Sequence, residues 1–425
     1  MTGANDRGFR GGGGRFQVAI EIEQHKSGLV PWGNAQPPLI SAAPAARCTT
    51  CVIVPARDEA VSITATLQAL HEQVALDGRP CDRKRYEIIV LANNCRDATA
   101  EIARAFSRSH PTLHLHVVER ALPEAVATIG AVRRLLMDEA CRRLLERGRR
   151  RGIIASTDAD TIVAPTWLAA IEAEMRRGAD VVGGRIIARE ERGDDENAEP
   201  SSRLYHLRDV AYGHLIAELE SLLDPDPADP WPRHHQHFGA NLAMTAETYE
   251  RAGGLPAVPE LEDMAFHDAL RRIDARIRHS PSVRVITSAR RMGRVAVGLS
   301  TQLGEWDALA RAGRLPLVES PAAAEHRVRR RRALRELWYY ARADGMPGAD
   351  ALPAVARSLH LDRRWLALEV LRSQTFGIFV ERVLAHGGAG EDARGLEPLA
   401  EITTAIAMLR LRLAVLRRCR RVPVL

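Results

Sequence analysis

The sequence predicts an α/β fold in which a mostly parallel sheet is flanked by helices and followed by a helical C-terminal extension. From residue 47, short apolar runs alternate with segments of helical spacing, as they do in βαβ units. Polar side chains follow several of these runs, at the edge where parallel sheets bind their ligands. Beyond about residue 300 only the helical spacing continues.

The composition is that of a globular protein. The chain has 425 residues, of which 46% are hydrophobic and 27% are charged, and its formal net charge is +6. Full disorder and a collagen-like repeat are excluded, because they need low hydrophobicity or a regular glycine period. The six cysteines are scattered along the chain, which indicates reduced thiols rather than a disulfide framework.

Apolar runs define the expected strands. These strands lie at residues 51–55, 86–92, 113–118, 152–156 and 179–183. Apolar residues at three- and four-residue intervals predict helices at residues 61–75, 97–109, 124–148, 165–177 and 203–223. The proline-rich stretch 224–232 is expected to be a loop, because proline lacks the amide donor that a helix needs.

The chain divides into three parts. Residues 1–46 are rich in Gly, Pro and Ala without periodicity and predict a flexible N-terminal segment. Residues 47–295 form the predicted catalytic α/β domain, and residues 296–425 form the helical C-terminal region. No apolar stretch of about 18 residues is present and no signal peptide is recognisable, so we expect a cytoplasmic protein.

The strongest local motif is Asp158-Ala-Asp160, which comes directly after the apolar run 153–155. Carboxylates at a strand end can hold a divalent cation that bridges a diphosphate, because Mg²⁺ and similar cations prefer oxygen ligands. An isolated acid-x-acid triplet is more often a solvated turn. Its position at the mouth of a predicted parallel sheet favours the ligand interpretation.

Polar residues also follow the first two predicted strands, in Val54-Pro-Ala-Arg-Asp-Glu59 and Asn93-Asn-Cys-Arg-Asp97. Either Asp58 or Asp97 taken alone is explained as a cap of the following helix. Together with Asp158 and Asp160, three polar strand ends in register predict a nucleotide pocket.

Two more motifs lie downstream. Gly239-Ala-Asn241 precedes a short helical segment, and Glu262-Asp263 begins another. A carboxylate of this pair could serve as a general base, whereas capping of the helix at 262–273 is the structural alternative.

In this order and with these gaps, the five motifs resemble those of the family 2 glycosyltransferases, which have the GT-A fold of nucleotide-diphospho-sugar transferases. The resemblance covers about residues 50–290. It implies transfer of a single sugar from a nucleoside-diphosphate sugar, in the manner of a hexosyltransferase. The acceptor is expected to be small or lipid-linked, because the chain lacks the Gln-x-x-Arg-Trp motif of processive synthases.

The resemblance also assigns site residues. In the family, the acid after the first strand binds the base, which corresponds to Glu59. Expected nucleotide-sugar contacts are Pro55, Ala56, Arg57, Glu59, Asn93, Asn94, Asp97, Asp158, Gly239, Asn241 and Arg290. The DxD motif corresponds to Asp158 and Asp160, which would bind Mg²⁺ or Mn²⁺ as a cofactor.

The catalytic pair implied by the resemblance is Glu262 and Asp263. Asp263 is the expected general base of an inverting displacement, although some enzymes with similar donor sites retain configuration. A histidine is the expected third metal ligand, with His279 and His237 preferred over His267.

Two further features leave alternatives open. Arginines are frequent in the predicted helix around 131–151, and the segment 405–421 combines an apolar stripe with arginines, which could lie on an anionic membrane surface. The alternative function is therefore a non-catalytic basic adaptor that binds nucleic acid or anionic lipid. A sugar nucleotidylyltransferase is disfavoured, because no glycine-rich loop follows the first predicted strand.

Overall fold

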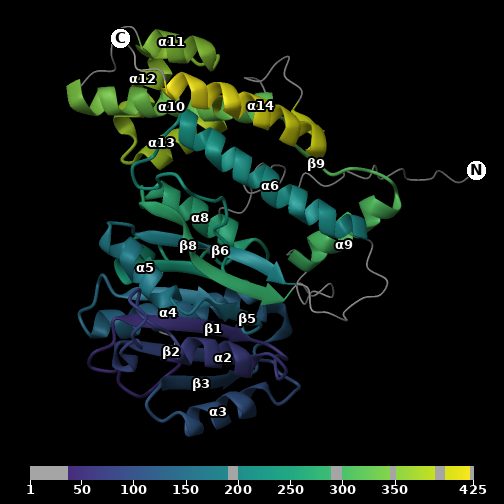
Figure 1. The fold of residues 1–425 in the computed structure, drawn as a ribbon. Helices are drawn as coiled ribbons and strands as arrows, with labels where there is room; N and C mark the ends of the chain where they lie inside the picture. Colours follow the sequence, from purple (N-terminus) through teal and green to yellow (C-terminus); the bar gives the residue numbers. More distant parts are fainter. Residues whose placement is uncertain (1–36, 190–199, 289–298, 345–350, 388–397, 422–425) are drawn as a thin grey trace, which may run out of the picture.

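The computed structural model describes residues 37–189, 200–288, 299–344, 351–387 and 398–421, and Figure 1 shows their arrangement. The predicted α/β architecture with C-terminal helices is confirmed. Eight strands form one sheet in the order β3-β2-β1-β4-β7-β6-β8-β5. Their bounds are β1 (Thr50–Ala56), β2 (Tyr86–Asn93), β3 (His114–Arg120), β4 (Ile153–Thr157), β5 (Thr161–Val163), β6 (Val181–Arg189), β7 (Asn241–Thr245) and β8 (Ile277–Ser288).

The first half of the sheet is parallel. Strand β1 pairs in parallel with β2 and β4, and β2 pairs in parallel with β3. Strand β7 is antiparallel to both β4 and β6, and β5 is antiparallel to β8, whereas β6 and β8 run parallel to each other. The polar residues that follow β1, β2 and β4 therefore meet at one edge of the sheet.

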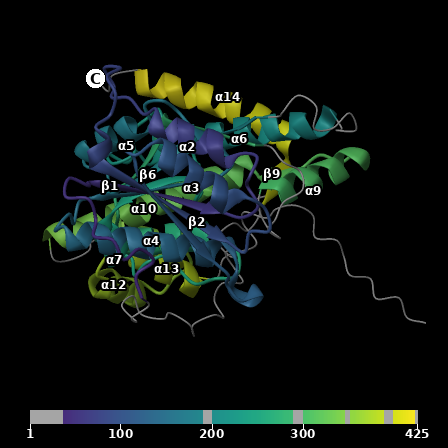
Figure 2. The ribbon, with the colours of Figure 1, turned by 90° about the horizontal axis from the view of Figure 1, so that it is seen from below.

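Helices cover both faces, so β1 and β2 are buried along their whole length and read as continuous apolar runs. Figure 2 shows α2 and α5 on one side of the strands and α4 and α7 on the other. The bounds are α2 (Ile63–His71), α3 (Thr99–Ser109), α4 (Ile129–Glu146), α5 (Trp167–Arg176), α7 (Ala246–Arg251) and α8 (Glu262–Arg272), with short 3-10 turns η2 (Arg83–Arg85) and η3 (Glu124–Val126).

Alternate side chains of β1 enter two separate hydrophobic cores. Val52 and Val54 pack with residues of α2, α3 and α5, whereas Cys51 and Ile53 pack with residues of α4, α7 and α8. Both cores are needed to hold the strand ends that carry the predicted site.

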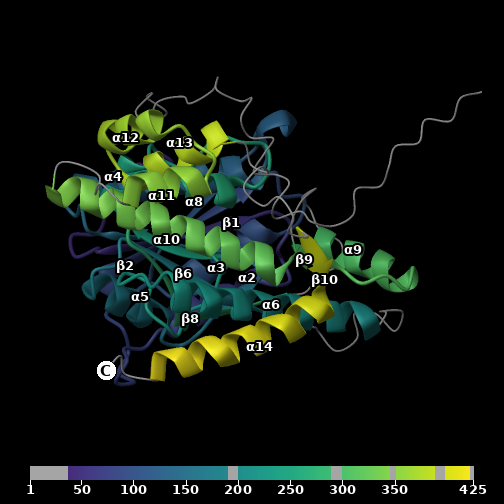
Figure 3. The same ribbon diagram turned by 90° about the horizontal axis from the view of Figure 1, so that it is seen from above.

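The C-terminal region is helical, as expected, except for the two-stranded sheet of β9 (Leu317–Glu319) and β10 (Leu399–Glu401). Three residues are too few to produce a recognisable alternation, which explains why the sequence did not predict these strands. The helices are α6 (Pro200–Leu223), α9 (Leu299–Arg311), α10 (Pro321–Asp344), α11 (Ala351–Ser358), α12 (Arg363–Arg372), α13 (Phe376–Gly387) and α14 (Ile402–Arg421). Figure 3 shows α10 to α13 grouped together, and α14 running beside α6.

Part of the predicted flexible N-terminal segment is anchored to α4. The backbone amide of Leu39 donates to Glu139, 3.2 Å away, and Arg143 and Arg147 each donate to backbone carbonyls of this segment at 2.8 Å. Residues 1–36 lie outside the described residues. Among the described residues, no helix combines the length and hydropathy needed to cross a membrane.

A tight contact between α8 and α13 provides a test of the fold. A Cβ added at Gly377 would overlap the backbone oxygen of Arg271, whereas one added at Gly304 of α9 would meet no atom within 4 Å. We expect Gly377→Ala to lower the free energy of unfolding by about 1–3 kcal/mol, because α13 must shift. Gly304→Ala is the control and should raise it by about 0.5–1 kcal/mol. Urea unfolding measures both, and equal effects would contradict the predicted packing.

Candidate active site at the carboxyl edge of the sheet

The loops after β1 and β2 are tied together by two aspartates. The Asp58 carboxylate accepts from the amide of Arg96 at 2.6 Å, and the Asp97 carboxylate accepts from the amide of Ala60 at 3.0 Å. Asp58 has a positive φ of 53°, a conformation that Asp and Asn adopt more readily than most residues. These bonds fix the two loops relative to each other.

Several residues that are predicted to contact the nucleotide also form hydrogen bonds within the protein. Asp97 accepts from the amide of Thr99 at 3.0 Å, so the capping alternative for this residue is realised at the start of α3. Glu59 is buried and accepts from the Ser62 hydroxyl at 2.6 Å. The side-chain amide of Asn94 donates to the carbonyl of Leu122 at 2.8 Å and accepts from its backbone amide at 3.0 Å.

The other residues predicted beside the nucleotide lie on the same two strands. Pro55 and Ala56 are the last residues of β1 and are buried, and Arg57 follows them and is half-buried. Asn93 ends β2 and is buried. The structure therefore brings this group to one edge, as the motifs indicated.

Arg133 of α4 lies at the centre of the site and was not predicted as a site residue. Its guanidinium donates to Asp158 at 3.0 Å and also to Glu262, so one buried cation joins the residue after β4 to the residue that begins α8. A Cβ at Gly239 would overlap this guanidinium, which shows why glycine is required there. The Ser156 hydroxyl donates to the Gly239 carbonyl at 2.6 Å and holds that backbone in place.

The sequence contained a signal for Arg133. Together with Met137, Ala140 and Leu144 it occupies positions i, i+4, i+7 and i+11, so it lies on the apolar face of α4 rather than on the solvated one. A charged residue on an apolar face needs a buried partner, which holds for Arg133 and also for Arg143, whose guanidinium pairs with the buried Glu87 at 2.8 Å.

The acidic pair splits into a buried and a partly exposed member. Burial raises the pKa of Glu262, and the charge of Arg133 opposes that rise. Asp263 is partly exposed, and its carboxylate accepts from the amide of Met264 at 2.8 Å. The two neighbours therefore differ in environment although they are adjacent in sequence.

Asp160 lies between β5 and β8. Its carboxylate accepts from the hydroxyls of Thr161 at 3.3 Å and Thr287 at 3.5 Å. Asp158 and Asp160 present carboxylate oxygens, which is the donor set that Mg²⁺ and Mn²⁺ prefer, so the residues present fit the expected cation.

His279 does not lie with this carboxylate pair. Its possible ligand atom falls within 4.8 Å of those of His237 and His267, and no group of three ligands in the described part of the chain includes Asp158 or Asp160. On the β6 side, His279 pairs with Gly183 and Thr287 pairs with Ala188. Five residues of strand separate these positions by about 16 Å, too far for the side chains to meet readily.

Asn241 has a structural role in the sheet. Its amide oxygen accepts from the indole of Trp167 at 2.8 Å, and its amide nitrogen donates to the carbonyls of Arg185 and Val283 at 3.1 and 3.3 Å. Contact of Asn241 with a nucleotide sugar stays a prediction and would require the amide to leave these partners. Arg290, the predicted diphosphate contact, lies outside the described residues.

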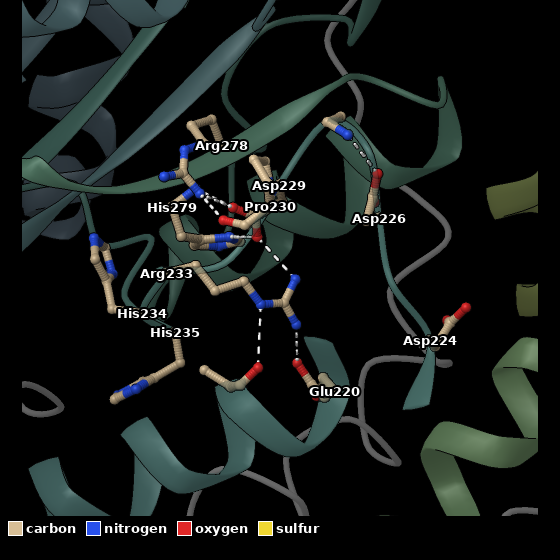
Figure 4. Close-up of polar contacts among 12 residues, drawn as sticks. Glu220, Asp224, Asp226, Asp229, Pro230, Arg233, His234, His235, Arg278 and His279 are labelled. Atoms are coloured by element: carbon tan, nitrogen blue, oxygen red, sulfur yellow. Dashed lines mark hydrogen bonds and ion pairs between the residues drawn. The ribbon is translucent and has the colours of Figure 1, made fainter. Parts of the chain in front are cut away.

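A buried network behind the histidines centres on Asp229, and Figure 4 shows it in close-up. The Asp229 carboxylate is bonded by His279 at 2.7 Å, Arg233 at 2.9 Å and Arg278 at 3.1 Å. Burial alone would raise the pKa of Asp229, but the hydrogen bond from His279 and the nearby charges hold it at about 2. Asp229 therefore fixes the orientation of the His279 ring.

His234 lies beside this network and is neutral. One ring nitrogen contacts the Ser280 carbonyl at 3.1 Å, and the other accepts from the amide of Gln236 at 3.0 Å. Burial, followed by the charge of His279, lowers the pKa of His234 to about 3.

In a comparison with known proteins, part of the chain matches the model of one protein family. Residues 51–217 match the family model described as glycosyl transferase family 2. No curated protein sequence matches the chain.

The chain is also similar to several solved structures. A mannosyltransferase from Pyrobaculum calidifontis in complex with GDP-Man and Mn²⁺ is 21% identical over 90% of each chain, with a TM-score of 0.39. TarS 1–349 of S. aureus in complex with UDP is 15% identical over 87% of this chain and 89% of its own, with a TM-score of 0.41. Glucosyl-3-phosphoglycerate synthase from Mycobacterium tuberculosis, with UDP bound, is 20% identical over 64% of this chain and 83% of its own, with a TM-score of 0.34.

The neutral state of His234 makes stability depend on pH. Because its pKa in the folded protein, about 3, is below the ordinary value of 6.5, its contribution is complete above about pH 6.5 and is lost as pH falls toward 3. We expect His234→Gln to lose less free energy of unfolding than the wild type between pH 7 and 4. Urea unfolding at both pH values measures this. His214→Gln, at an exposed position of α6, is the control, and a wild-type pH dependence in His234→Gln would refute the assignment.

Proposed function

We propose that the chain transfers a single sugar from a nucleoside-diphosphate sugar to an acceptor hydroxyl, since residues 51–217 match the model of glycosyl transferase family 2. The observation that carries this proposal is the Arg133 ion-pair set. It joins Asp158 of the acid-x-acid motif to Glu262 of the acidic pair, which are 104 positions apart in the chain. Acids on the donor side and on the acceptor side thus share one small volume.

Donor binding is supported by the loops after β1 and β2. Their aspartates are fixed by backbone amides, so the pocket is preorganised before a ligand arrives. In the proposal, Glu59 and Asp97 contact the base and ribose. A Mg²⁺ or Mn²⁺ ion held by Asp158 and Asp160 would stabilise the negative charge of the leaving diphosphate as a Lewis acid.

Asp263 is the proposed general base, and Glu262 is the proposed positioning residue. Glu262 is buried and bonded to Arg133, so it cannot reach an acceptor without breaking that pair. Asp263 is partly exposed at the first turn of α8 and can accept a proton from a hydroxyl. A single displacement with Asp263 as base inverts the anomeric configuration.

The adaptor alternative receives little support from the arginine-rich helix. Arg142 pairs with Glu139 and Glu146 at 2.7 Å, and Arg133 is buried. Two arginines of this helix, Arg133 and Arg143, are thus buried and Arg142 is paired, which leaves fewer free cations for nucleic acid than the sequence alone indicates.

Membrane contact through α14 belongs to the proposal for lipid-linked acceptors. Met408, Leu411 and Val415 are exposed at helical spacing on its outer face, with side chains 49, 72 and 49% accessible. Arg410 and Arg418 are exposed beside them, which is the pattern of a helix that lies on an anionic surface.

Nucleotide binding is the first test. We expect UDP or GDP to bind in calorimetric titration only when Mn²⁺ or Mg²⁺ is present. Asp160→Asn should weaken that metal-dependent binding by about tenfold or more, which is at least about 1.4 kcal/mol. Absence of nucleotide binding with metal in the wild type would refute the donor site.

Catalysis by Asp263 has a separate readout. Asp263→Asn should lower kcat by about 10²–10⁴-fold without weakening nucleotide binding, because only proton acceptance is lost. Glu260→Gln, an exposed acid three residues earlier, is the matched control and should leave kcat near the wild-type value. Steady-state kinetics with the donor nucleotide identified by titration measures kcat for both variants. Equal kcat values for Asp263→Asn and the control would exclude Asp263 as the base.

A further inference from the structure

Two partly buried arginines, Arg271 on α8 and Arg331 on α10, form no ion pair within the described residues. In the part of the chain that the structure describes, the side chains of Arg271 and Arg331 form no ion pair within 4.0 Å and no hydrogen bond, and the Nε of Arg331 is buried without a partner. Their neighbours differ. Arg327 pairs with Glu220 at 3.0 Å and with Glu319 at 3.1 Å, and Arg335 pairs with Asp224 at 3.1 Å. Glu220, Glu319 and Asp224 are therefore already paired, and the charge of Asp268, three residues before Arg271, acts on Arg271 without an ion pair.

Arg271, Arg331 and His267 lie near enough to one another for their charges to interact. Burial, followed by the charges of Arg271 and Arg335, lowers the pKa of Arg331 to about 10. Burial also lowers the pKa of His267, and the further causes, His237, Arg271, His279 and Arg331, are all basic groups. Several basic groups thus lie close together at one place, where the charges of Asp268, Asp224 and Glu220 offset theirs only from a distance.

The histidines extend the same basic cluster. The ring of His267 stacks on that of His237 with centroids 4.1 Å apart, and the ring of His279 lies 6.4 Å from His267. The nearby carboxylate of Asp229 is already bonded by Arg233 and Arg278, so it does not offset the charge of Arg271 or Arg331.

Two ligand chemistries fit three adjacent imidazoles, and the charges decide between them. The ring nitrogens lie within 4.8 Å of one another, which is near the spacing of a metal site. A cation would however be repelled by two unpaired guanidinium groups, whereas an anion would neutralise them. Guanidinium groups also match phosphate oxygens through paired hydrogen bonds, so phosphate is the favoured ligand.

We propose that Arg271, Arg331 and His267 bind a phosphate group of the acceptor, and that the acceptor is a phosphomonoester. This inference rests on the proposed transferase function, because it places the acceptor beside Asp263. Asp263, His267 and Arg271 occupy positions i, i+4 and i+8 of α8 and therefore share one face of the helix. The helical rise separates the first from the last by about 12 Å.

That spacing limits the size of the acceptor. A hydroxyl at Asp263 and a phosphate between His267 and Arg271 are one to two helical turns apart, about 5–11 Å. A phosphomonoester with a short carbon chain or one sugar ring spans this distance. The phosphate could belong to a free metabolite or to a lipid headgroup, and both offer the same dianionic group.

The test is calorimetric titration of inorganic phosphate and of sn-glycerol 3-phosphate into the full chain. We expect both to bind the wild type, and Arg271→Gln and Arg331→Gln each to weaken binding at least tenfold. Matched controls are Arg272→Gln and Arg332→Gln, adjacent arginines that are exposed and paired with Glu381 at 2.6 Å and Glu336 at 2.7 Å. The controls should stay within about twofold of the wild type.

Three outcomes would overturn the inference. The first is equal affinity for phosphate in Arg271→Gln and its control, Arg272→Gln. The second is competitive displacement of phosphate by UDP or GDP, which would assign these arginines to the donor site. The third is tight binding of Zn²⁺ or Co²⁺ that is lost in His267→Gln, without phosphate binding. If Arg331→Gln does not fold by circular dichroism, Arg331→Lys replaces it. That variant keeps the charge but loses the paired hydrogen bonds, and it should bind phosphate more weakly than the wild type.

Two additional experiments distinguish a lipid headgroup from a free metabolite, and the phosphate site from the proposed transferase function. Vesicles of phosphatidylcholine with phosphatidic acid test the lipid source, and retention of the wild type but not of Arg271→Gln would identify a headgroup. Stronger binding of glycerol 3-phosphate than of these vesicles would identify a soluble acceptor. Nucleotide binding with Mn²⁺ should be unchanged in Arg271→Gln. If the wild type binds phosphate but no nucleotide, the proposed transferase function is refuted and the phosphate site is still supported.

Discussion

The buried guanidinium of Arg133 is the constraint on which the site depends. It is buried and forms ion pairs with the carboxylates of Asp158 and Glu262, so removing either partner would leave incompletely compensated charge in the interior. The ion pairs also set the position of α8 relative to β4. Gly239 must lack a side chain because the guanidinium passes over it.

The sheet brings the other predicted site residues to the same edge. Parallel pairing of β1 with β2 and β4 aligns their carboxyl ends, and the following loops are then joined by aspartate–amide hydrogen bonds. Asn241 extends the rigid region to β6 and β8 through its amide. A preorganised edge of this kind binds a nucleotide at a low cost in ordering entropy.

Helix α8 connects the two parts of the proposed chemistry. Its first turn carries the acidic pair, and its later turns carry His267 and Arg271, which meet α10 and the histidines of β8 and the preceding loop. In the proposal, the C-terminal helices thus complete the acceptor side of the site. Gly377 allows α13 to approach α8 closely enough for this arrangement.

The amino-acid sequence by itself determined the strand and helix alternation, the order of the motifs and the edge at which they meet. Those features follow from local periodicity and from the topology of parallel strands. It did not identify Arg133 as a member of the site, and it expected His279, of the histidines His237, His267 and His279, to join Asp158 and Asp160 as a third metal ligand. Only the tertiary structure decided these partners, because a buried charge or a ring contact depends on residues far apart in the chain. For the same reason the sequence could not predict that Arg271 and Arg331 form no ion pair, because the partners of an arginine depend on its surroundings in the fold and not on its sequence neighbours.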